Sequence, residues 1–518
     1  MAALDPNMPN PSVTPMPTEN PSVPNQTIGQ VPVGQSFMPV SGQTPMPPPP
    51  LPQQPPTPTT SQEVVGMGNT DGGRKGIPKI LLIVVGAVIL IGILAFIAMK
   101  FIVPGVSKSG PVTLTWWGLW EDEATVSPII AEYNQQHPNV KIQYVKQSKE
   151  DYRERLTNTL AKGAGAPDIF TYHNSWVPMF KNDLDILPST VMTAQEYSQT
   201  FFSIANSDLR TQNGIVGIPL GIDTLALFVN DDIFTAYGKP VPKTWDDLRQ
   251  AALDLTVRDA NGNIQQAGVA LGRTENVDNW QEILALMMLQ NGVKLSDMTP
   301  VDRASTALTY YTLFAGTDHV WDETLPPSTV AFATGKLAMY FGPSWRVFEI
   351  KQQNPNLKFS VVAVPQLPKD NPAQPNVTYA TYWAQGVSAK STAKEAAWDF
   401  LKFISTKDSL QKIYQTAAQA RQYGEPYPRV DMATLLSSDK IFGAFVSQAP
   451  DSQSWYLDSR TFDGATGINS QIGKYFEDAI NSMNKGTDVA RVISTLTPGI
   501  SQVLSTYGLA PAPAATQP

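Results

Sequence analysis

A stretch of twenty residues without a charge, Ile80 to Met99, constrains this chain more than any other feature. At about 1.5 Å rise per residue, a helix of this length matches a hydrocarbon core roughly 30 Å thick. A cleaved signal peptide would have a shorter apolar region, about 7 to 15 residues, with a small-residue cleavage site soon after it. Here Lys100 and Phe101 follow instead. The stretch therefore predicts one uncleaved transmembrane helix within residues 77–103.

The charges beside this span predict its orientation. Arg74, Lys75 and Lys79 precede it, whereas Lys100 and Lys108 follow it. This positive-inside bias is weak but favours a cytoplasmic amino terminus. We therefore expect a single-pass protein of the cell membrane whose carboxy-terminal domain is extracytoplasmic.

The segments outside the predicted domain are rich in proline or short. Residues 1–76 hold few large apolar side chains and no Lys or Arg before Arg74, which predicts a disordered cytoplasmic tail. Its run from Met46 to Pro52 is typical of polyproline II, so the tail could instead dock a proline-binding cytoplasmic partner. Residues 104–111 form a tether of at most roughly 25 Å, and residues 509–518 a disordered end.

Composition limits the classes that remain. The chain has 518 residues, too many for one hydrophobic core, and no cysteine, which excludes disulfides, thiolate metal sites and a lipidated cysteine anchor. Its net charge of −8 excludes a basic nucleic-acid footprint.

From Val112 onward, predicted strands alternate with predicted helices, which favours an α/β fold with largely parallel sheets. The predicted strands are 112–116, 140–145, 168–172, 268–271, 337–341 and 359–364. The predicted helices are 127–136, 152–162, 277–290, one from Thr299 onward, 395–404, 472–483 and 489–504.

Residues 214–248 carry the most specific pattern. Two apolar strands, 215–219 and 225–229, enclose a single carboxylate, Asp223. Thr244 begins a helix and Asp247 follows three residues later, which is the pattern of a capping box.

This layout resembles the crossover of bacterial extracellular solute-binding proteins of family 1, the sugar-binding components of ABC importers. Asn230-Asp231 and Lys243 to Leu248 recur there in register. Further segments resemble family motifs in the same order along the chain: Gly163–Ile169, Phe332–Met339, Gly342–Trp345, Gly386–Ser388 and Ala396–Phe403. The resemblance covers nearly all of residues 112–508.

The resemblance implies a two-lobe, periplasmic-binding-protein-like (type II) fold with a hinge and an interlobe cleft. It implies that lobe 1 takes about 112–222 and 378–425, and that lobe 2 takes about 223–377 and 426–508. The solute-binding domain would then be 112–508.

A sugar has apolar ring faces edged with hydroxyls, so its site needs aromatic platforms and a few aimed polar groups. Trp176 and Trp345 match cleft positions of the family, but either could instead pack in a hydrophobic core. Asp223 matches an acid that contacts ligand in some relatives, but its carboxylate could instead bond backbone amides. The other candidates follow predicted strands or begin helices, where ligands of open α/β sheets bind. The candidate ligand-binding residues are Trp117, Trp120, Glu121, Tyr172, His173, Asn174, Ser175, Trp176, Asp223, Asn279, Trp280, Trp345, Trp383 and Trp455, with Arg421 and Tyr456 as weaker candidates.

Other conspicuous side chains are expected to be structural. Strand alternation or helix pattern assigns Trp116, Trp245 and Trp398 to hydrophobic cores. Asp168 enters a strand, where an acid usually accepts bonds from backbone N–H groups.

Enzyme motifs are missing from the sequence. The three histidines, His137, His173 and His319, lack metal-ligand spacing, and neither a G-x-S-x-G elbow nor a phosphate-binding loop occurs. Paired carboxylates of a glycosidase stay open, because their spacing is spatial. We expect no catalytic residue, no metal and no cofactor.

The leading interpretation is a membrane-anchored substrate-binding protein that delivers a sugar or oligosaccharide to ABC permease subunits. The alternative is a single-pass sensory receptor that uses the same fold to signal to a cytoplasmic partner. A carbohydrate-active enzyme is the third interpretation.

Overall fold

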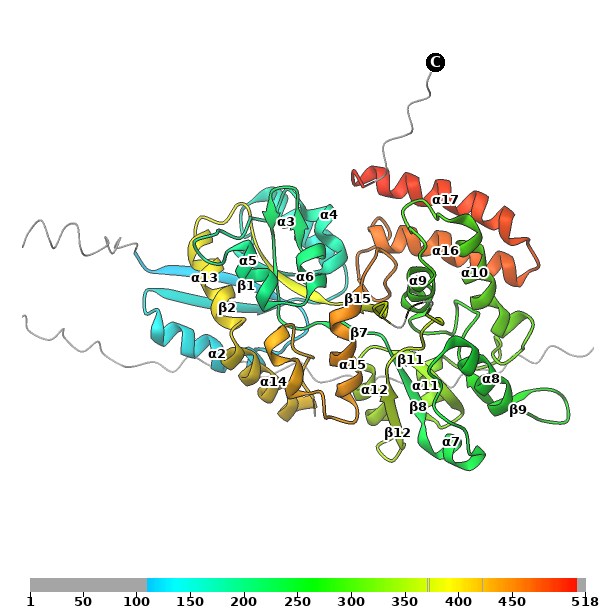
Figure 1. Cartoon of the computed structure of the whole chain (residues 1–518). Helices are drawn as coiled ribbons and strands as arrows, with labels where there is room; N and C mark the ends of the chain where they lie inside the picture. The colour runs from blue at the N-terminus through cyan, green and yellow to red at the C-terminus, as the bar shows by residue number, and fades with distance from the viewer. Residues whose placement is uncertain (1–109, 370, 372, 422, 510–518) are drawn as a thin grey trace, which may run out of the picture. The chain divides into compact units, whose positions relative to one another are not determined.

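The computed structural model describes residues 110–369, 371, 373–421 and 423–509, which belong to one compact unit of the chain, residues 104–518 (Figure 1). The predicted membrane span at 80–99, the proline-rich tail, nearly all of the tether and the end after residue 509 lie outside the described residues. Among the residues that are described, no helix combines the length and the apolar character that crossing a membrane requires.

The first sheet is built mainly from the early part of the chain. Its strand order is β2-β1-β3-β14-β6. Strands β1, β2 and β3 are parallel, whereas β14 runs antiparallel to β3 and β6. The bounds are β1 (Val112–Gly118), β2 (Val140–Lys146), β3 (Ile169–His173), β6 (Ile218–Pro219) and β14 (Trp383–Val387).

The helices of this half supply the apolar side chains that pack with the sheet into one core. They are α2 (Glu123–Gln136), α3 (Tyr152–Lys162), α4 (Val177–Phe180), α5 (Ala194–Thr200), α6 (Ser203–Asp208), α13 (Lys394–Ile404) and α14 (Lys407–Arg421), with the 3₁₀ turn η1 (Asn174–Trp176) and the hairpin β4 (Arg210–Thr211) and β5 (Gly214–Ile215).

The second sheet has the order β12-β8-β11-β10-β9. Its strands are β8 (Ala226–Asn230), β9 (Val257–Arg258), β10 (Ile264–Val269), β11 (Leu337–Gly342) and β12 (Phe359–Val362). The helices of this half are α7 (Asp231–Tyr237), α8 (Trp245–Leu255), α9 (Trp280–Gln290), α10 (Val301–Gly316), α11 (Ser328–Ala333), α12 (Arg346–Gln353), α15 (Phe442–Gln448), α16 (Ile468–Asn484) and α17 (Val489–Thr506). They form a second core with this sheet.

A small sheet, β15-β13-β7, lies where the chain passes between the two halves. Strand β7 (Asp223–Thr224) leads toward the second sheet, β13 (Thr378–Thr381) leads back to the first, and β15 (Ser452–Gln453) follows the third passage and the turns η2 (Val430–Leu435) and η3 (Ala449–Asp451). In Figure 1, β7 and β15 lie in the middle of the view, with the first sheet to the left and the second to the right.

The buried apolar side chains divide in the same way. One core takes residues from 114–222, 380–404 and Ala449, and the other takes residues from 225–364, Tyr379 and 442–504. This division parallels the predicted lobes, although their limits stay predictions.

Several local predictions can be compared with the structure. The capping box is confirmed, because Thr244 Oγ1 accepts from the N–H of Asp247 and the Asp247 carboxylate accepts from the N–H of Thr244, both at 3.1 Å. Asp168 is structural as predicted, since its Oδ2 accepts from the N–H of Thr115 at 2.9 Å. The prediction that Ser127 begins a helix is wrong: α2 begins at Glu123, and the Ser127 hydroxyl donates to the Glu123 carbonyl.

The expectation of largely parallel sheets is also wrong in part. Strand β8 pairs antiparallel with both β11 and β12, and β14 pairs antiparallel with β3. Both β8 and β14 enter their sheet directly from the small connecting sheet, so neither follows a βαβ crossover, the connection that makes neighbouring strands parallel.

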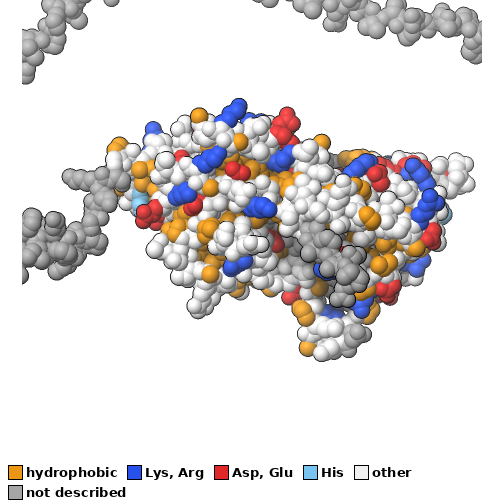
Figure 2. Space-filling view, turned by 90° about the horizontal axis from the view of Figure 1, so that it is seen from above, with side chains coloured by type: hydrophobic (Ala, Val, Ile, Leu, Met, Phe, Trp, Pro, Cys, Tyr) orange, Lys and Arg blue, Asp and Glu red, His pale blue; other side chains and the backbone are white. Residues whose placement is uncertain are grey.

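Charged side chains of both signs are interspersed on the face seen in Figure 2, with single hydrophobic side chains between them. That face shows no basic stripe of the kind that binds nucleic acid.

We predict that Gly268→Ala lowers the free energy of unfolding by about 1–3 kcal/mol, because the added methyl group would meet the backbone of Ala252 on α8. Gly473→Ala is the matched control. It lies within α16 with open space around it, and the change is expected to raise stability by about 0.5–1 kcal/mol. Urea unfolding of the two full-length variants measures both effects, and equal midpoints would contradict the close packing of α8 on β10.

Candidate functional site

A cavity of about 380 Å³ lies where the two halves meet. Its lining comes from the ends of β1, β3 and β14, from the passages between the halves, and from a loop before α16. The side chains used below are Trp120, Glu121, Thr171, His173, Asp223, Asn279, Glu282, Trp345, Thr381, Tyr382, Trp383, Arg421, Glu425, Ser459, Arg460 and Phe462.

One wall of the cavity is aromatic and belongs mainly to the first half. Trp383 meets Trp120 edge to face, with ring centroids 5.3 Å apart and planes at 70°. Behind it, Trp383 meets fully buried Trp176 at 5.4 Å and His173 at 5.0 Å. The antiparallel register of β14 places Trp383 opposite His173, at the carboxyl end of β3. The exposed indole of Trp120 thus lies against the indole of Trp383, which Trp176 and His173 hold in place.

The opposite wall belongs to the second half. Trp345 precedes the first turn of α12, and the guanidinium groups of Arg346 and Arg460 lie over its ring at 4.3 and 4.9 Å. Phe462 reaches across to Trp120, with ring centroids 5.7 Å apart. The cavity therefore offers flat aromatic surfaces from both halves.

The charges in the cavity are largely paired. Arg421 lies 2.7 Å from Glu121 and 3.3 Å from Glu425, and Arg460 lies 3.5 Å from Glu349. Burial raises the pKa of Glu425, with the neighbouring Arg421 acting in the opposite direction. These pairs partly neutralise the charges that line the cavity.

Asp223 is buried in the cavity wall and is held mainly by Ser344. Its carboxylate accepts from the Ser344 N–H at 2.9 and 3.0 Å and from the Ser344 hydroxyl at 2.9 Å. Burial, reinforced by Glu425, raises the pKa of Asp223 to about 8, against the lowering effect of the Ser344 bonds. The carboxyl group is therefore mostly neutral at pH 7.

His173 has both ring nitrogens occupied. Its Nδ1 lies 2.7 Å from the Ser175 hydroxyl and its Nε2 lies 2.7 Å from the Thr381 hydroxyl. Burial lowers the pKa of His173 to about 3, so the ring is neutral. It can contact a guest only through its ring edge.

The structure brings half of the candidate ligand-binding residues together. Those that line the cavity are Trp120, Glu121, His173, Asp223, Asn279, Trp345 and Trp383, joined by the weaker candidate Arg421. Those that do not line it are Trp117, Tyr172, Asn174, Ser175, Trp176, Trp280 and Trp455.

Strand alternation explains why Tyr172 does not line this cavity. Thr171 and His173 of β3 face the cavity, so Tyr172 between them faces the other side of the sheet and donates to the Val216 carbonyl at 3.3 Å. Asn174, Ser175, Trp455 and Tyr456 instead line a separate cavity of about 500 Å³. Trp117 packs against the first core.

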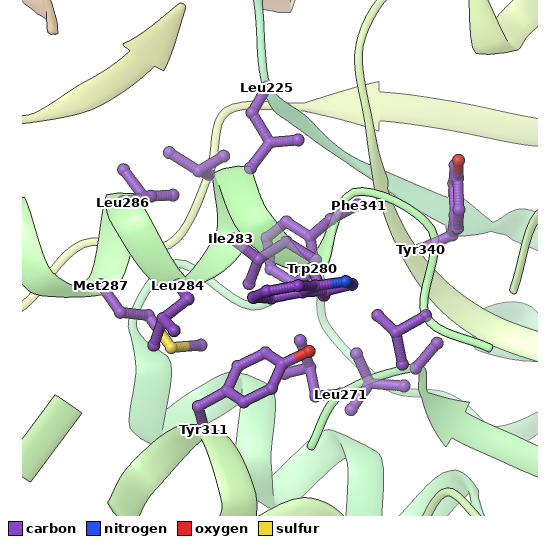
Figure 3. Close-up of a cluster of buried hydrophobic side chains, with 14 of the residues drawn as sticks. Leu225, Leu271, Trp280, Ile283, Leu284, Leu286, Met287, Tyr311, Tyr340 and Phe341 are labelled. Carbon is purple, nitrogen blue, oxygen red and sulfur yellow. The ribbon is translucent and has the colours of Figure 1, made fainter. Parts of the chain in front are cut away.

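Trp176 and Trp280 are core residues. Trp176 is fully buried against Tyr152 and Phe180. Trp280 begins α9, and Figure 3 shows its indole among Leu271, Ile283 and other apolar side chains of the second core. A tryptophan at a helix start has the same sequence signal whether it faces a cavity or a core.

The structure adds residues that sequence reasoning missed. Ser459, Arg460 and Phe462 come from one loop, in which Arg460 and Phe462 both have positive φ, 52° and 51°. Neither is glycine, asparagine or aspartate, so their own residue types do not mark these two positions, although Asp463-Gly464 marks a turn close by. Thr171, in contrast, could have been found from the alternation of the predicted strand 168–172.

The site is suited to binding rather than to metal chemistry. Within residues 110–369, 371, 373–421 and 423–509, no group of three or more His, Cys, Asp or Glu side chains could hold a metal ion. Indole faces and aimed hydroxyl and carboxyl groups suit a guest with apolar faces and polar edges.

Comparison with known proteins agrees with this geometry. The sequence profile of the family described as bacterial extracellular solute-binding protein matches residues 128–427. The maltotriose-binding protein of Pyrococcus abyssi is 23% identical over 313 residues, which cover 59% of this chain and 64%, less than two thirds, of that protein. The multiple sugar-binding protein of Streptococcus mutans is 21% identical over 330 residues, 60% of this chain and 74% of that protein.

Among solved structures, the cyclic alpha-maltosyl-1,6-maltose binding protein of Arthrobacter globiformis superimposes with a TM-score of 0.62 at 19% identity. The match covers 77% of this chain and all of that one. At this identity the likeness establishes a shared α/β fold alone.

We predict that Asp223→Asn gains stability relative to the wild type as pH rises from 5 to 8. The folded wild type keeps a proton up to about pH 8 that the unfolded chain, with its ordinary pKa of 3.8, has already released. The free energy of unfolding of the wild type therefore falls between pH 5 and pH 8, by about 1 kcal/mol or more. The asparagine variant does not titrate and does not lose this stability.

Urea unfolding of both full-length proteins at pH 5, 6.5 and 8 measures the difference. Asp247→Asn is the control, because hydrogen bonds from Thr244 lower the pKa of Asp247 and leave it ionised throughout this range. A constant difference between the wild type and Asp223→Asn would show that Asp223 is ionised in the folded protein.

Proposed function

The chain belongs to the bacterial extracellular solute-binding protein family, and from this premise we propose that it binds a sugar or oligosaccharide in the aromatic cavity as the substrate-binding component of an ABC importer. The family consists of solute-binding proteins, so the role is binding rather than catalysis. The bound sugar would be handed to permease subunits in the membrane.

The observation that carries this proposal is that Trp383 of the first half and Trp345 of the second half line one cavity. A pyranose ring presents apolar C–H faces, which pack on indole rings, and a rim of hydroxyls, which need hydrogen-bonding partners. The hydroxyl of Thr381 and the carboxyl groups of Glu121 and Glu282 are such partners. Relatives named for maltotriose and for multiple sugars support the same ligand class.

Binding would bring the two halves together. Phe462 of the second half contacts Trp120 of the first, and the Lys149 ammonium lies 5.3 Å from the Phe462 ring centroid. A ligand held by both walls favours the arrangement in which these contacts form, since it gains interactions there that separated halves cannot offer. The passages at β7, β13 and residues 426–441 would act as the hinge.

We also propose that the protein is anchored by residues 80–99, with its amino terminus in the cytoplasm and its binding domain outside. This part of the proposal rests on the sequence, namely twenty uncharged residues and the charges that flank them. An extracytoplasmic domain is what the family requires. The sensory alternative depends on the proline-rich tail alone, and no observation favours it over import.

We predict that Trp383→Ala weakens saccharide binding at least about tenfold, because it removes one aromatic platform and the support of Trp120. Trp383→Phe should lose less. Calorimetric titration of the full-length chain in detergent with mono- and malto-oligosaccharides measures the change.

Trp398→Phe is the matched control. Trp398 is equally aromatic and fully buried, but it lies in the first core with its indole bonded to Asp185. Its replacement should leave the affinity unchanged. If the wild type gives no binding heat across a broad saccharide screen, the proposal is wrong. If Trp383→Ala and Trp398→Phe lose the same affinity, the cavity is not the binding site.

We predict that residues 80–99 decide where the protein resides. The full chain should sediment with membranes, and a chain lacking these residues should not. Because the natural sequence has no cysteine, single cysteines can report the topology. A membrane-impermeant maleimide should label exposed Lys485→Cys in intact cells and leave Ser12→Cys unlabelled. The reverse labelling pattern would overturn the proposed orientation.

A further inference from the structure

A buried chain of hydrogen bonds connects helix α16 of the second half to the cavity wall. Asn469 Nδ2 lies 2.7 Å from Ser175 Oγ, Ser175 Oγ lies 2.7 Å from His173 Nδ1, and His173 Nε2 lies 2.7 Å from Thr381 Oγ1. Asn469, Ser175 and His173 are 2%, 3% and 2% exposed, so the first two of these bonds are buried. Thr381 lines the cavity.

The direction of donation along this chain is fixed at its start. Asn469 Nδ2 also donates to the Asp463 carboxylate at 3.3 Å, and Asp463 accepts from the Asn469 backbone N–H at 2.8 Å. Because the carboxylate accepts, the Asn469 atom beside it is the amide nitrogen and not the oxygen. Ser175 Oγ therefore accepts from Asn469, and its own hydrogen is free for His173.

The direction continues through the histidine. The backbone N–H of Ser175 also points at His173 Nδ1, at 3.3 Å, so this nitrogen is the acceptor of the ring. A neutral imidazole has one N–H, which must then be on Nε2, and it donates to Thr381. The Thr381 hydroxyl donates to no acceptor within the described part of the protein, so its hydrogen is available to a ligand.

The Asn469 end of this chain of hydrogen bonds also holds the loop that forms the opposite wall of the cavity. This Arg460 loop, residues 458–464, places Ser459, Arg460 and Phe462 on the cavity. The positive φ angles of Arg460 and Phe462 store strain that surrounding bonds must hold. Two carboxylates stabilise the loop. Asp463 accepts a hydrogen bond from the Asn469 N–H, and Glu282 accepts one from the Ser459 N–H at 2.7 Å.

We propose that Ser175 and Asn469 are positioning residues for the binding site. Their hydrogen bond joins the two halves, holds the Arg460 loop against the aromatic wall, and orients the Thr381 hydroxyl hydrogen toward an acceptor oxygen of the ligand. The inference rests on the proposed function. It gives a role in sugar binding to two residues that neither touch the sugar nor line its cavity.

The first test is a mutant cycle on the full-length chain in detergent, titrated calorimetrically with the saccharide that the wild type binds best. Ser175→Ala and Asn469→Ala should each weaken binding about five- to twentyfold. The double variant should bind no more weakly than the weaker single variant, because both changes remove the same bond. Ser405 is a buried serine whose hydroxyl bonds the Lys402 carbonyl, away from the cavity, so Ser405→Ala should bind like the wild type.

The second test reads the histidine directly and needs no ligand. Nitrogen NMR of ¹⁵N-histidine-labelled protein should show His173 as the neutral Nε2–H tautomer, and only three histidines need assignment. Ser175→Ala should shift the Nδ1 signal. Thr381→Val, which leaves the chain intact up to the histidine, should weaken binding while the tautomer stays the same.

Wild-type affinity in both Ser175→Ala and Asn469→Ala would overturn the proposal, as would an Nδ1–H tautomer in the wild type. If the wild type binds no saccharide, the proposed function fails, and the tautomer still decides whether the chain runs in the stated direction. If it binds sugar and the variants bind equally well, only the positioning role fails.

Discussion

The binding site depends on the contact between Trp383 and Trp176. Trp176 is fully buried in the first core, and its edge-to-face contact at 5.4 Å holds the Trp383 indole at the cavity surface. Trp120 then lies against Trp383, and Phe462 of the other half lies against Trp120. A rigid indole loses little conformational entropy when it meets a ligand. The wall is therefore preorganised from the core outward, and Phe462 of the second half contacts it.

Three passages of the chain between the halves make this arrangement possible. They separate two sheets, each with its own apolar core, and leave the cavity between them. Polar groups at the junction are bonded across it, as in the chain from Asn469 to Thr381. Each half has its own core, which is what the proposed hinge motion requires.

Much of the architecture could be predicted from the sequence, because it is encoded locally. The capping box at Thr244, the acid–backbone bond of Asp168 and the alternation of strands and helices each depend on neighbouring residues. The sheet directions could not be read this way: β8 and β14 are antiparallel because they enter from the connecting sheet, a property of the whole path of the chain.

Part of the site was predictable from strand ends and part from the resemblance to the family. Trp120 and His173 follow predicted strands, whereas Trp280 begins a helix and packs into a core. The Arg460 loop carries no glycine at its two positive-φ positions, so its geometry is imposed by Asp463, Glu282 and α16. Long-range bonds of this kind leave no local trace in a sequence.

The central claim is that one sugar is gripped between indoles from both halves, and a crystal structure of the chain grown with a malto-oligosaccharide tests it most directly. The account predicts a pyranose ring packed between Trp383 and Trp345, with Thr381 within hydrogen-bonding distance of a sugar oxygen. A sugar bound elsewhere, with these indoles making no contact to it, would contradict the account.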